Sequence, residues 1–476
     1  MAIESDVLVI GGGLAGVASA VAAAREGADV RLVSHKKSTL RQASGLIDGL
    51  GFVPPRTPPD ERAAYLSQER QDFREVRANR GSYEGPLPTP YDGFDALPPD
   101  HPYSLLGPDA LREGLALFDD LVGDRYLGSH TERNALVPTF GGSVKPTARY
   151  PRAAAAGLAS DERPMLVVGF RSLSAFDARM VADRIDAVGV PFEVEGAEVG
   201  FAEAFRADAT VTRLARALDH DESIDGTPAR RALAAAVEPH LGAAERVGFP
   251  AFLGDDAADE VRRDLADRLG ADVFEVPMGP PSLPGLRLED RLFEVLDAEG
   301  VRFETGNPVV GVQSTTGDRL TAVRVDRKGR EVPYHADAFV LAAGGLVGKG
   351  LDSDREGVRE PVFDCHVPHP SDRYDWFVDD ALGDHPYARF GVRPDATMRP
   401  LDAAGAPEFA NLHAAGAVVG GADVAREKSA SGVSLATGLV AGRQAARTSL
   451  DAIERGDADV DTSTGTDTDS TGPPHD

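Results

Sequence analysis

Cysteine is almost absent from this chain, since Cys365 is the only one among 476 residues. One thiol cannot form an intrachain disulfide, and it cannot supply the several ligands that an iron–sulfur cluster or a cysteine-bound zinc ion needs. The sequence therefore excludes disulfides within the chain, cysteine-ligated iron–sulfur clusters and cysteine-bound zinc sites.

Long apolar runs are also missing. No run reaches the roughly 18 residues of a membrane-spanning helix, and the opening MAIESDVLVIGGG lacks the basic segment and cleavage site of a secretion signal. We expect a chain that is cytoplasmic and soluble by itself.

Lysine is scarce as well: the chain has six lysines and 44 arginines against 77 acidic residues, and its net charge is −27. Negative charge repels nucleic acid and anionic lipid, so neither is expected as a direct partner. Acidic, lysine-poor surfaces resemble those of proteins from salt-accumulating halophiles, where concentrated salt screens the repulsion. We therefore interpret the charge as an adaptation to salt.

The length of the chain predicts two or three domains, and its first 34 residues predict a βαβ unit. Residues 6–10 (DVLVI) and 29–33 (DVRLV) are short runs of branched apolar residues, and between them GGGLAG opens an alanine-rich stretch that ends near Gly27. This order is typical of a parallel sheet. A buried strand at 337–345 (DAFVLAAGG) predicts that the chain returns to the same sheet after a long insertion.

The glycine turn matches the pattern G-x-G-x-x-G at Gly11, Gly13 and Gly16, directly after a predicted strand and at the start of a predicted helix. The first glycine permits a tight turn, the second lets the backbone approach a pyrophosphate, and the third lets the helix pack on the strand. The helix N-terminus then stabilises the phosphate charge. The competing interpretation is a glycine turn that binds nothing.

The second strand lacks the acidic residue that usually binds the ribose of a dinucleotide, because DVRLV continues into Ser34, His35, Lys36 and Lys37. Three explanations stay open. Ser34 or the backbone contacts the ribose, the two lysines hold a 2′-phosphate, or the ligand is a mononucleotide without that ribose. The lysines are otherwise typical of an exposed, solvated turn.

A second glycine-rich unit lies near the C-terminus, where LHAAGAVVGG (412–421) predicts a strand and a turn, and SASGVSLATG opens an alanine-rich helix. A nicotinamide-binding protein needs no such unit, whereas it suits the cap of a flavin ring. The positive end of this helix, near residues 433–435, would face the pyrimidine edge, where reduction places negative charge. The competing interpretation is a small-residue helix packed closely on a sheet.

These motifs resemble the flavoproteins of the fumarate reductase and glycerol-3-phosphate dehydrogenase kind and, among them, the B-subunit family of the anaerobic glycerol-3-phosphate dehydrogenases. The resemblance covers most of residues 1–450. It rests on GGGLAG and the C-terminal glycine unit, together with SGLIDGLG (44–51), TFGGSVKPT (139–147), VVGFRSLSAFD (167–177), PPSLPGLRLEDRL (280–292) and FVLAAGG (339–345).

The pattern and the resemblance together predict an α/β fold, in which a discontinuous Rossmann-like flavin-binding domain carries an inserted α+β cap or substrate domain. We expect the flavin-binding domain at residues 1–58 and 335–452 and the inserted domain at 59–334. The polar, acidic tail at 453–476 is expected to be disordered.

The cofactor that the resemblance implies is a flavin. The family and the missing acid on the second strand favour FMN, and FAD, which the glycine turn alone suggests, is the alternative. The residues expected around it are Gly11, Gly13 and Gly16 at the phosphates, Ser34 after the second strand, Ser44 and Gly45 near the ring, Gly344 and Gly345 at a close-approach turn, and Gly416, Gly432, Val433 and Ser434 at the pyrimidine edge.

The function that the resemblance implies is that of the B subunit in a complex that oxidises sn-glycerol 3-phosphate to dihydroxyacetone phosphate in glycerol catabolism. Its partners would be the A subunit, a catalytic flavoprotein, and the C subunit, which carries iron–sulfur clusters and attaches to the membrane. Oxidation of a secondary alcohol needs a base and cations for the phosphate. The candidates are His366, His369 and His413 for the base, and Lys145, Arg149, Arg171 and Arg287 for the phosphate, and each has a structural interpretation beside the functional one.

Two other functions stay open. One is a free-standing flavin dehydrogenase or ketosteroid-type desaturase that works without partners. The other is a non-catalytic scaffold, whose degenerate flavin fold stabilises a catalytic partner. The missing strand-two acid and the absence of a legible substrate site keep the scaffold in consideration.

Overall fold

A computed structural model describes residues 3–36, 38–54, 83–171, 173–201, 211–280, 282–381 and 383–463. The residue pattern at 60–79 predicts an amphipathic helix, but these residues lie outside this part of the chain. So do the last residues of the predicted tail, and so does Lys37.

The larger sheet is built around the first strand of the chain. Its strand order is β13-β2-β1-β16-β15-β14, and β19 also pairs with β16. Strands β1, β2, β13, β16 and β19 run parallel, whereas β14 and β15 are antiparallel to their neighbours. Their bounds are β1 (Ile3–Ile10), β2 (Val30–Ser34), β13 (Arg302–Thr305), β14 (Val309–Thr316), β15 (Arg319–Asp326), β16 (Glu331–Leu341) and β19 (Leu412–Ala414).

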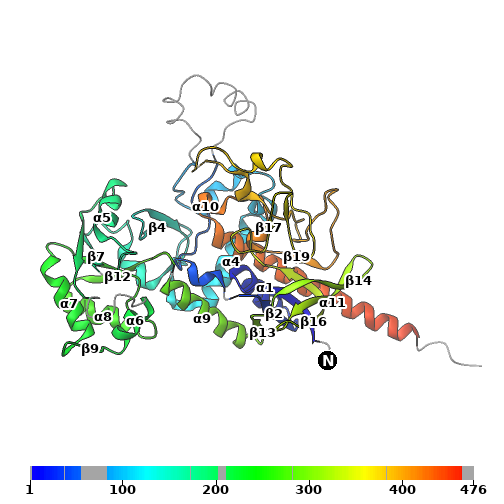
Figure 1. Cartoon of the computed structure of the whole chain (residues 1–476), viewed down its shortest axis with the longest axis horizontal. Helices are drawn as coiled ribbons and strands as arrows, with labels where there is room; N and C mark the ends of the chain where they lie inside the picture. The colour runs from blue at the N-terminus through cyan, green and yellow to red at the C-terminus, as the bar shows by residue number, and fades with distance from the viewer. Residues whose placement is uncertain are drawn as a thin grey trace, which may run out of the picture.

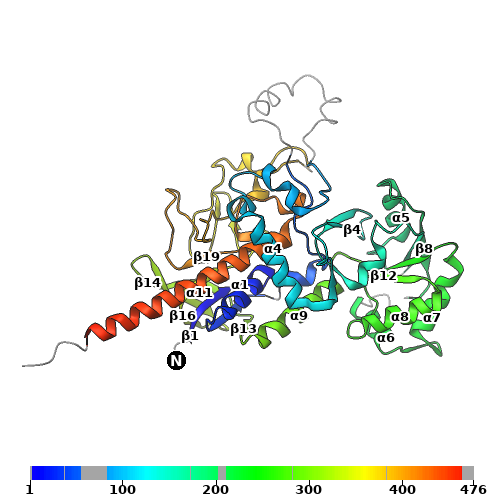
Figure 2. The ribbon, with the colours of Figure 1, turned by 180° about the vertical axis from the view of Figure 1, so that it is seen from behind.

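Two helices, α1 (Leu14–Arg25) and α11 (Ala430–Ser463), pack side by side beside this sheet (Figures 1 and 2). Small residues allow the close approach: a Cβ on Gly438 would lie 2.6 Å from the Ala15 carbonyl oxygen, and one on Gly442 would overlap that of Ser19. Helices α4 (Pro102–Val122) and α9 (Leu283–Ala298) also lie in this half of the molecule. The first and last glycine motifs are therefore joined by direct helix packing.

The inserted segment forms a separate parallel sheet of order β12-β11-β7-β8, which lies at one end of the molecule in Figure 1. Buried apolar side chains from both of its faces pack against the surrounding helices. The bounds are β7 (Met165–Phe170), β8 (Val194–Val199), β11 (Arg246–Pro250), β12 (Asp272–Val276), α5 (Ala178–Ala187), α6 (Val211–Asp219), α7 (Ala229–Val237) and α8 (Ala258–Leu269).

Short elements complete the fold. They are β3 (Tyr126–Leu127), β4 (Ala135–Pro138), β5 (Val144–Thr147), β6 (Tyr150–Pro151), β9 (Ser223–Ile224), β10 (Thr227–Pro228), β17 (Asp352–Ser353), β18 (Val358–Arg359), α10 (Val424–Glu427), and the 3₁₀ helices η1 (Thr39–Gln42), η2 (Pro90–Ala96), η3 (Gly123–Arg125), η4 (Arg152–Gly157), η6 (Glu238–His240), η7 (Arg373–Trp376), η8 (Pro386–Arg389) and η9 (Gly416–Val418).

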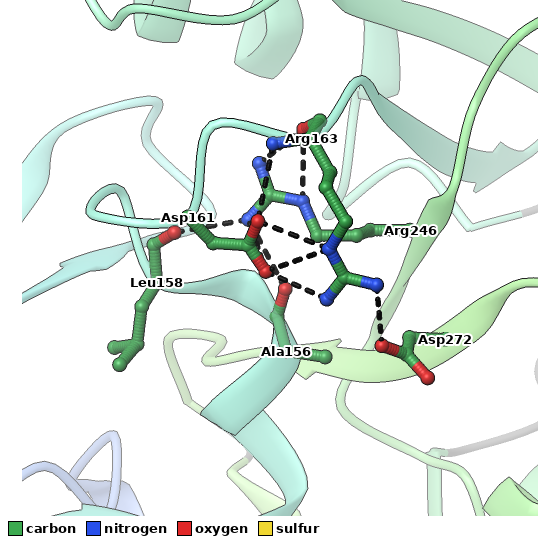
Figure 3. Close-up of polar contacts among 6 residues, drawn as sticks. All are labelled: Ala156, Leu158, Asp161, Arg163, Arg246 and Asp272. Carbon is green, nitrogen blue, oxygen red and sulfur yellow. Dashed lines mark hydrogen bonds and ion pairs between the residues drawn. The ribbon is translucent and has the colours of Figure 1, made fainter.

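A fully buried arginine binds residues 156–163, the segment that leads into the inserted sheet (Figure 3). The guanidinium of Arg246, on β11, donates hydrogen bonds to the carbonyl oxygens of Ala156, Leu158 and Arg163. It also lies over the ring of Phe192, 4.5 Å from the centroid. Burying this charge lowers the pKa of Arg246. The guanidinium is thus the side-chain donor for three backbone carbonyls, of which that of Leu158 also accepts from the amide of Asp161.

The predicted α/β fold with a discontinuous nucleotide-binding unit is confirmed, but the chain returns to the larger sheet earlier than residue 335. Strand β13 already pairs with β2, and the hairpin β14–β15 continues the sheet through β16. A mixed sheet accepts antiparallel strands at its edge, so the hairpin β14–β15 belongs to the larger sheet and not to the inserted domain. At the other end, α11 continues past residue 452, where we expected the tail to begin.

Candidate functional site

The first glycine turn is tightly packed at its two ends. Gly11 has a φ of +120°, and a Cβ there would overlap the carbonyl oxygen of Ala342, which follows β16. A Cβ on Gly16 would overlap the carbonyl oxygen of Gly11. Any larger residue at either position has to push strand and helix apart, so both glycines are required for packing.

The middle glycine is different, because open space lies in front of it. Gly13 is the N-cap of α1 with an extended backbone (φ −79°, ψ −178°), and a Cβ there would meet nothing within 4 Å. Within the described residues no side chain caps α1, and its first turn contains no acidic residue. The first amides of the helix, together with its dipole, are therefore available for an anion, and the turn fits a phosphate group.

Ser34 ends β2 beside this turn. Its hydroxyl is buried and donates a 2.8 Å hydrogen bond to the carbonyl oxygen of Lys36, and a Cβ on Gly12 would lie 3.2 Å from it. Lys36 is exposed. Ser34 therefore lies where a ribose would approach the second strand, as the sequence predicts, and its role in binding stays a prediction.

The C-terminal glycine unit reaches the same edge of the sheet. Gly416 has a φ of +73°, and a Cβ there would lie 2.7 Å from the Ala15 Cβ and 3.8 Å from the Ser434 Oγ. Its amide donates a 2.9 Å hydrogen bond to Thr437 Oγ1 on α11. The turn before η9, the first turn of α1 and the first turns of α11 therefore meet in one place.

The turn after β16 completes this edge. Gly344 has a φ of +88°, and a Cβ on Gly345 would lie 2.6 Å from the carbonyl oxygen of Ala417 in η9. The structure therefore gathers most of the predicted cofactor residues where the carboxyl ends of β1, β2, β16 and β19 meet. In open parallel sheets ligands bind at this edge.

The beginning of α11 is bound by the segment 44–51. The carboxylate of Asp48 accepts a 2.9 Å hydrogen bond from the Ser431 amide. The backbone carbonyl oxygen of Asp48 accepts a second one, of 2.8 Å, from the Gly432 amide. The missing side chain of Gly432 faces the hydroxyl of Tyr103 and the carbonyl of Gly49. Gly432 is therefore a packing glycine, buried against protein as its neighbour Val433 is. Ser434 is partly exposed and is the predicted residue that still faces outward.

A buried ion pair lies at this helix N-terminus. Lys145 Nζ, on β5, is 2.8 Å from the second carboxylate oxygen of Asp48. Burial alone would raise the pKa of Asp48, but the attraction of Lys145 and the hydrogen bonds from Lys145 and Ser431 outweigh it and hold this pKa below its ordinary value. Asp48 is therefore an anion that caps α11.

The loop around Ser44 and Gly45 is fixed by contacts with other segments of the chain. Gly45 has a φ of +78°, and a Cβ there would lie 2.8 Å from that of Pro284 at the start of α9. Its carbonyl oxygen accepts a 2.9 Å hydrogen bond from the Tyr126 hydroxyl. The amide of Leu46 donates to Ser44 Oγ at 3.4 Å. The loop is thus fixed by Tyr126, which precedes the inserted sheet in the chain, and by Pro284, which follows it.

The candidate histidines do not gather at this edge. His413 is buried on β19, where its Nδ1 lies 2.8 Å from the Thr397 carbonyl oxygen and its Nε2 lies 3.4 Å from Thr448 Oγ1. Burial lowers the pKa of His413 to about 4. His369 is held between Val367 and Val358, and His366 is exposed. The geometry of His413 and His369 is that of structural histidines.

Most of the candidate cations have carboxylate partners. Arg149 forms two hydrogen bonds with Asp119, of 2.7 and 2.9 Å, and Arg287 forms two with the buried Glu275, of 2.7 and 3.1 Å. Arg171 is exposed at the end of β7 in the inserted sheet. Lys145 also has a carboxylate partner, Asp48, and through it lies at the start of α11.

Sequence reasoning did not single out Asp48, Tyr103, His101 or Glu427. His101 Nε2 lies 3.1 Å from Glu427 Oε2, which also accepts a hydrogen bond from the Ser429 hydroxyl. The Tyr103 hydroxyl donates to the carbonyl of Gly49 at 2.7 Å. Asp48 lies inside the motif SGLIDGLG, so a signal existed for it, whereas the other three lie in segments without a recognisable pattern.

Comparison with known proteins agrees with this geometry. A family model described as FAD binding domain matches residues 6–433. The chain therefore belongs to the FAD binding domain family of flavoproteins. Among solved structures, the open conformation of a flavocytochrome c3 fumarate reductase matches at 13% identity over 94% of this chain and 79% of that one, with a TM-score of 0.40.

Its curated relatives are more specific. The chain is 55% identical over 450 residues, 94% of its length and 99% of the relative's, to a probable B subunit of the anaerobic glycerol-3-phosphate dehydrogenase of Halobacterium salinarum. It is 29% identical to the B subunit of the anaerobic glycerol-3-phosphate dehydrogenase of Yersinia pseudotuberculosis, over 92% of this chain and 97% of that one. The resemblance to the B-subunit family is thereby confirmed. The family model names FAD, so it indicates FAD rather than the FMN that we favoured from the sequence.

Proposed function

We propose that this chain is the flavoprotein B subunit of an anaerobic sn-glycerol-3-phosphate dehydrogenase complex that reduces quinone, and that it binds FAD between α1 and α11. In this proposal glycerol 3-phosphate is oxidised to dihydroxyacetone phosphate within the complex. The observation that carries the proposal is the uncapped N-terminus of α1, with open space at Gly13, facing the turn of Gly416 and the start of α11.

The residues present fit FAD in particular. The first turn of α1 offers amides for a pyrophosphate, and Ser34 offers a hydroxyl at the strand end where a ribose would lie. Gly344, Gly345 and Gly416 keep the backbone free of side chains beside that turn. When bound, the flavin would supply the two-electron acceptor that oxidation of an alcohol requires.

The start of α11 has a defined part in this proposal. Asp48 takes the amides of Ser431 and Gly432, so these two cannot donate to a flavin. The next amide, that of Val433, already donates to the carbonyl oxygen of Ser429, so the helix would offer the pyrimidine edge its dipole and the partly exposed Ser434 rather than free amides. Asp48 thus positions the helix, while the helix dipole still acts on the ring.

Electrons would have to leave through a partner chain. Cys365, the only cysteine of the chain, is buried, and burial raises its pKa well above the ordinary value. In the part of the chain that the structure describes, no group of His, Cys, Asp and Glu residues could hold a metal ion, and no helix is long and apolar enough to cross a membrane. The path would be completed by a catalytic flavoprotein, the A subunit, and by an iron–sulfur protein that attaches to the inner face of the cell membrane, the C subunit.

The test measures the visible absorbance of the purified chain and its turnover with and without a partner protein. We expect a yellow protein that turns over glycerol 3-phosphate weakly when alone and rapidly when a cysteine-rich partner is co-expressed. Heat should release a cofactor that phosphodiesterase converts to FMN, because it is FAD. Rapid turnover without partners would favour the free-standing dehydrogenase, and a colourless protein would favour the non-catalytic scaffold.

A further inference from the structure

Two of the chain's six lysines lie together beside the N-terminus of α11. Lys145 is on β5, and Lys428 follows α10. Gly51 lies between their segments: a Cβ on Gly51 would overlap the ring of Pro146 and would lie 3.2 Å from the Lys428 Cβ. In a chain that uses arginine almost everywhere else, two neighbouring lysines in one half-buried place call for an explanation.

The backbone of Lys428 adds a second observation. Lys428 is the C-cap of α10 in the left-handed conformation (φ 53°, ψ 58°), a position that glycine or asparagine adopts more readily. Its ammonium donates one hydrogen bond, of 2.5 Å, to the Ala425 carbonyl oxygen, which leaves two of its three donors. The chain therefore accepts an unfavourable backbone conformation and keeps a cation with donors to spare.

The charges of the two lysines are compensated to different degrees. Asp48 pairs with Lys145 and also caps α11, whose N-terminus carries about half a positive charge. Asp48 and Asp423 both act to raise the pKa of Lys428, yet burial and the repulsion of Lys145 lower it on balance. Glu427, next to Lys428, is occupied by His101 and Ser429. Asp48 therefore compensates Lys145 and the first amides of α11, whereas Lys428 forms no ion pair within the described residues.

We propose that Lys145 and Lys428 form a binding site for the dianionic phosphate of a small phosphorylated polyol, opening beside Ala430 at the start of α11. A phosphate monoester carries nearly two negative charges at neutral pH and accepts several hydrogen bonds, which matches two ammonium groups better than a carboxylate does. Ala430 is exposed, and Ser431 is partly exposed, so the place is open to solvent.

The position of this site relative to a flavin rests on the proposed function. The start of α11 joins the lysine pair to Ser434, which lies beside Gly416 and the first turn of α1. If FAD binds there, a phosphate held by the pair would anchor a substrate near the pyrimidine end of the ring. The phosphate site itself depends only on the two lysines.

The test measures binding to the purified chain at one fixed ionic strength, by calorimetry, with sn-glycerol 3-phosphate, inorganic phosphate, glycerol and succinate as probes. We expect saturable binding of the two phosphates and none of glycerol or succinate. Lys428→Asn, which suits the left-handed backbone, should weaken phosphate binding about 10- to 100-fold, because each lost hydrogen bond between charged groups costs that much. Lys428→Arg should keep most of the affinity.

The matched control is Lys328→Asn. Lys328 is also left-handed (φ 58°) but lies in the exposed turn between β15 and β16, and its variant should bind like the wild type. Equal affinity of Lys428→Asn and wild type, or binding of glycerol as tight as that of glycerol 3-phosphate, would overturn the proposal. A colourless chain whose phosphate binding still depends on Lys428 would refute the proposed function and leave this site standing, and a yellow chain that binds no phosphate would do the reverse.

Discussion

The carboxylate of Asp48 and the amide of Ser431 are joined by a 2.9 Å hydrogen bond, although 383 positions separate them in the chain. The same carboxylate pairs with Lys145, so one buried acid connects the segment after η1, the strand β5 and the start of α11. The two halves of the discontinuous unit are therefore closed by a helix cap as well as by the sheet.

Replacing Asp48 by asparagine should weaken this closure. The amide oxygen can still accept from Ser431, but Lys145 is left half-buried without a counter-charge, so we expect the free energy of unfolding at pH 7 to fall by about 1–3 kcal/mol. Chemical denaturation measures this loss. Asp352→Asn is the control, because Asp352 is exposed on β17 and its variant should stay within about 0.5 kcal/mol of wild type.

The difference between wild type and Asp48→Asn should depend on pH in one direction. Because the pKa of folded Asp48 lies below the unfolded value of 3.8, its stabilisation is fully present above that value and is lost as the pH falls through the folded pKa. The two proteins should therefore converge in strong acid. A difference that stays the same from pH 7 into strong acid would show that the charge of Asp48 does not contribute.

Gly13 and Gly16 should respond to substitution in opposite ways. Gly13→Asp places a carboxylate at a helix N-cap with open space around it, so stability should rise by a few tenths of a kcal/mol while bound flavin is lost through repulsion of its phosphates. Gly16→Ala should cost about 1–3 kcal/mol, because its methyl group overlaps the carbonyl of Gly11. The melting temperature and the visible absorbance of each purified variant test both statements. Full flavin content in a folded Gly13→Asp protein would contradict the assignment of this turn.

The local pattern was enough to predict the first βαβ unit and the return of the chain to it. Periodicity and glycine spacing act over a few residues, and β1, α1 and β2 satisfy their geometry within 34 residues. The edge of the sheet could not be predicted in this way. Whether β13 joins β2 depends on a pairing across more than 260 residues, for which a single sequence carries no register signal.

The candidate site shows the same division. The glycines could be predicted because a positive φ or a close backbone contact requires glycine itself, which is visible in the sequence. The structure gathers Gly11, Gly344 and Gly416 at one edge of the sheet. The ion-pair partners of charged residues cannot be predicted in this way. Arg149 and Arg287 suited a phosphate by residue type, but their partners, Asp119 and Glu275, were chosen by tertiary packing.

Arg246→Met should be among the most damaging substitutions in the inserted sheet. The variant removes the side-chain donor of the Ala156, Leu158 and Arg163 carbonyl oxygens, of which, among the residues that the structure describes, only that of Leu158 keeps a backbone donor, so we expect a loss of about 3–5 kcal/mol. Arg163→Met is the matched control, since 40% of its side chain is exposed and its ion pairs should contribute less than about 1 kcal/mol. Urea denaturation compares the two, and equal losses would mean that the carbonyls find water when Arg246 is removed.

The burial of His413 should make the stability of the protein depend on pH. Its folded pKa of about 4 lies below the ordinary value of 6.5, so the unfolded chain binds the proton more readily, and stability is lost as the pH falls from 6.5 towards 4, by at most ~3 kcal/mol. His413→Gln keeps a donor for Thr397 and an acceptor for Thr448 but does not titrate, so its stability should change less over this range. Loss of turnover by an assembled complex that still holds its flavin and a folded His413→Gln chain would instead indicate that His413 is the base for the alcohol proton.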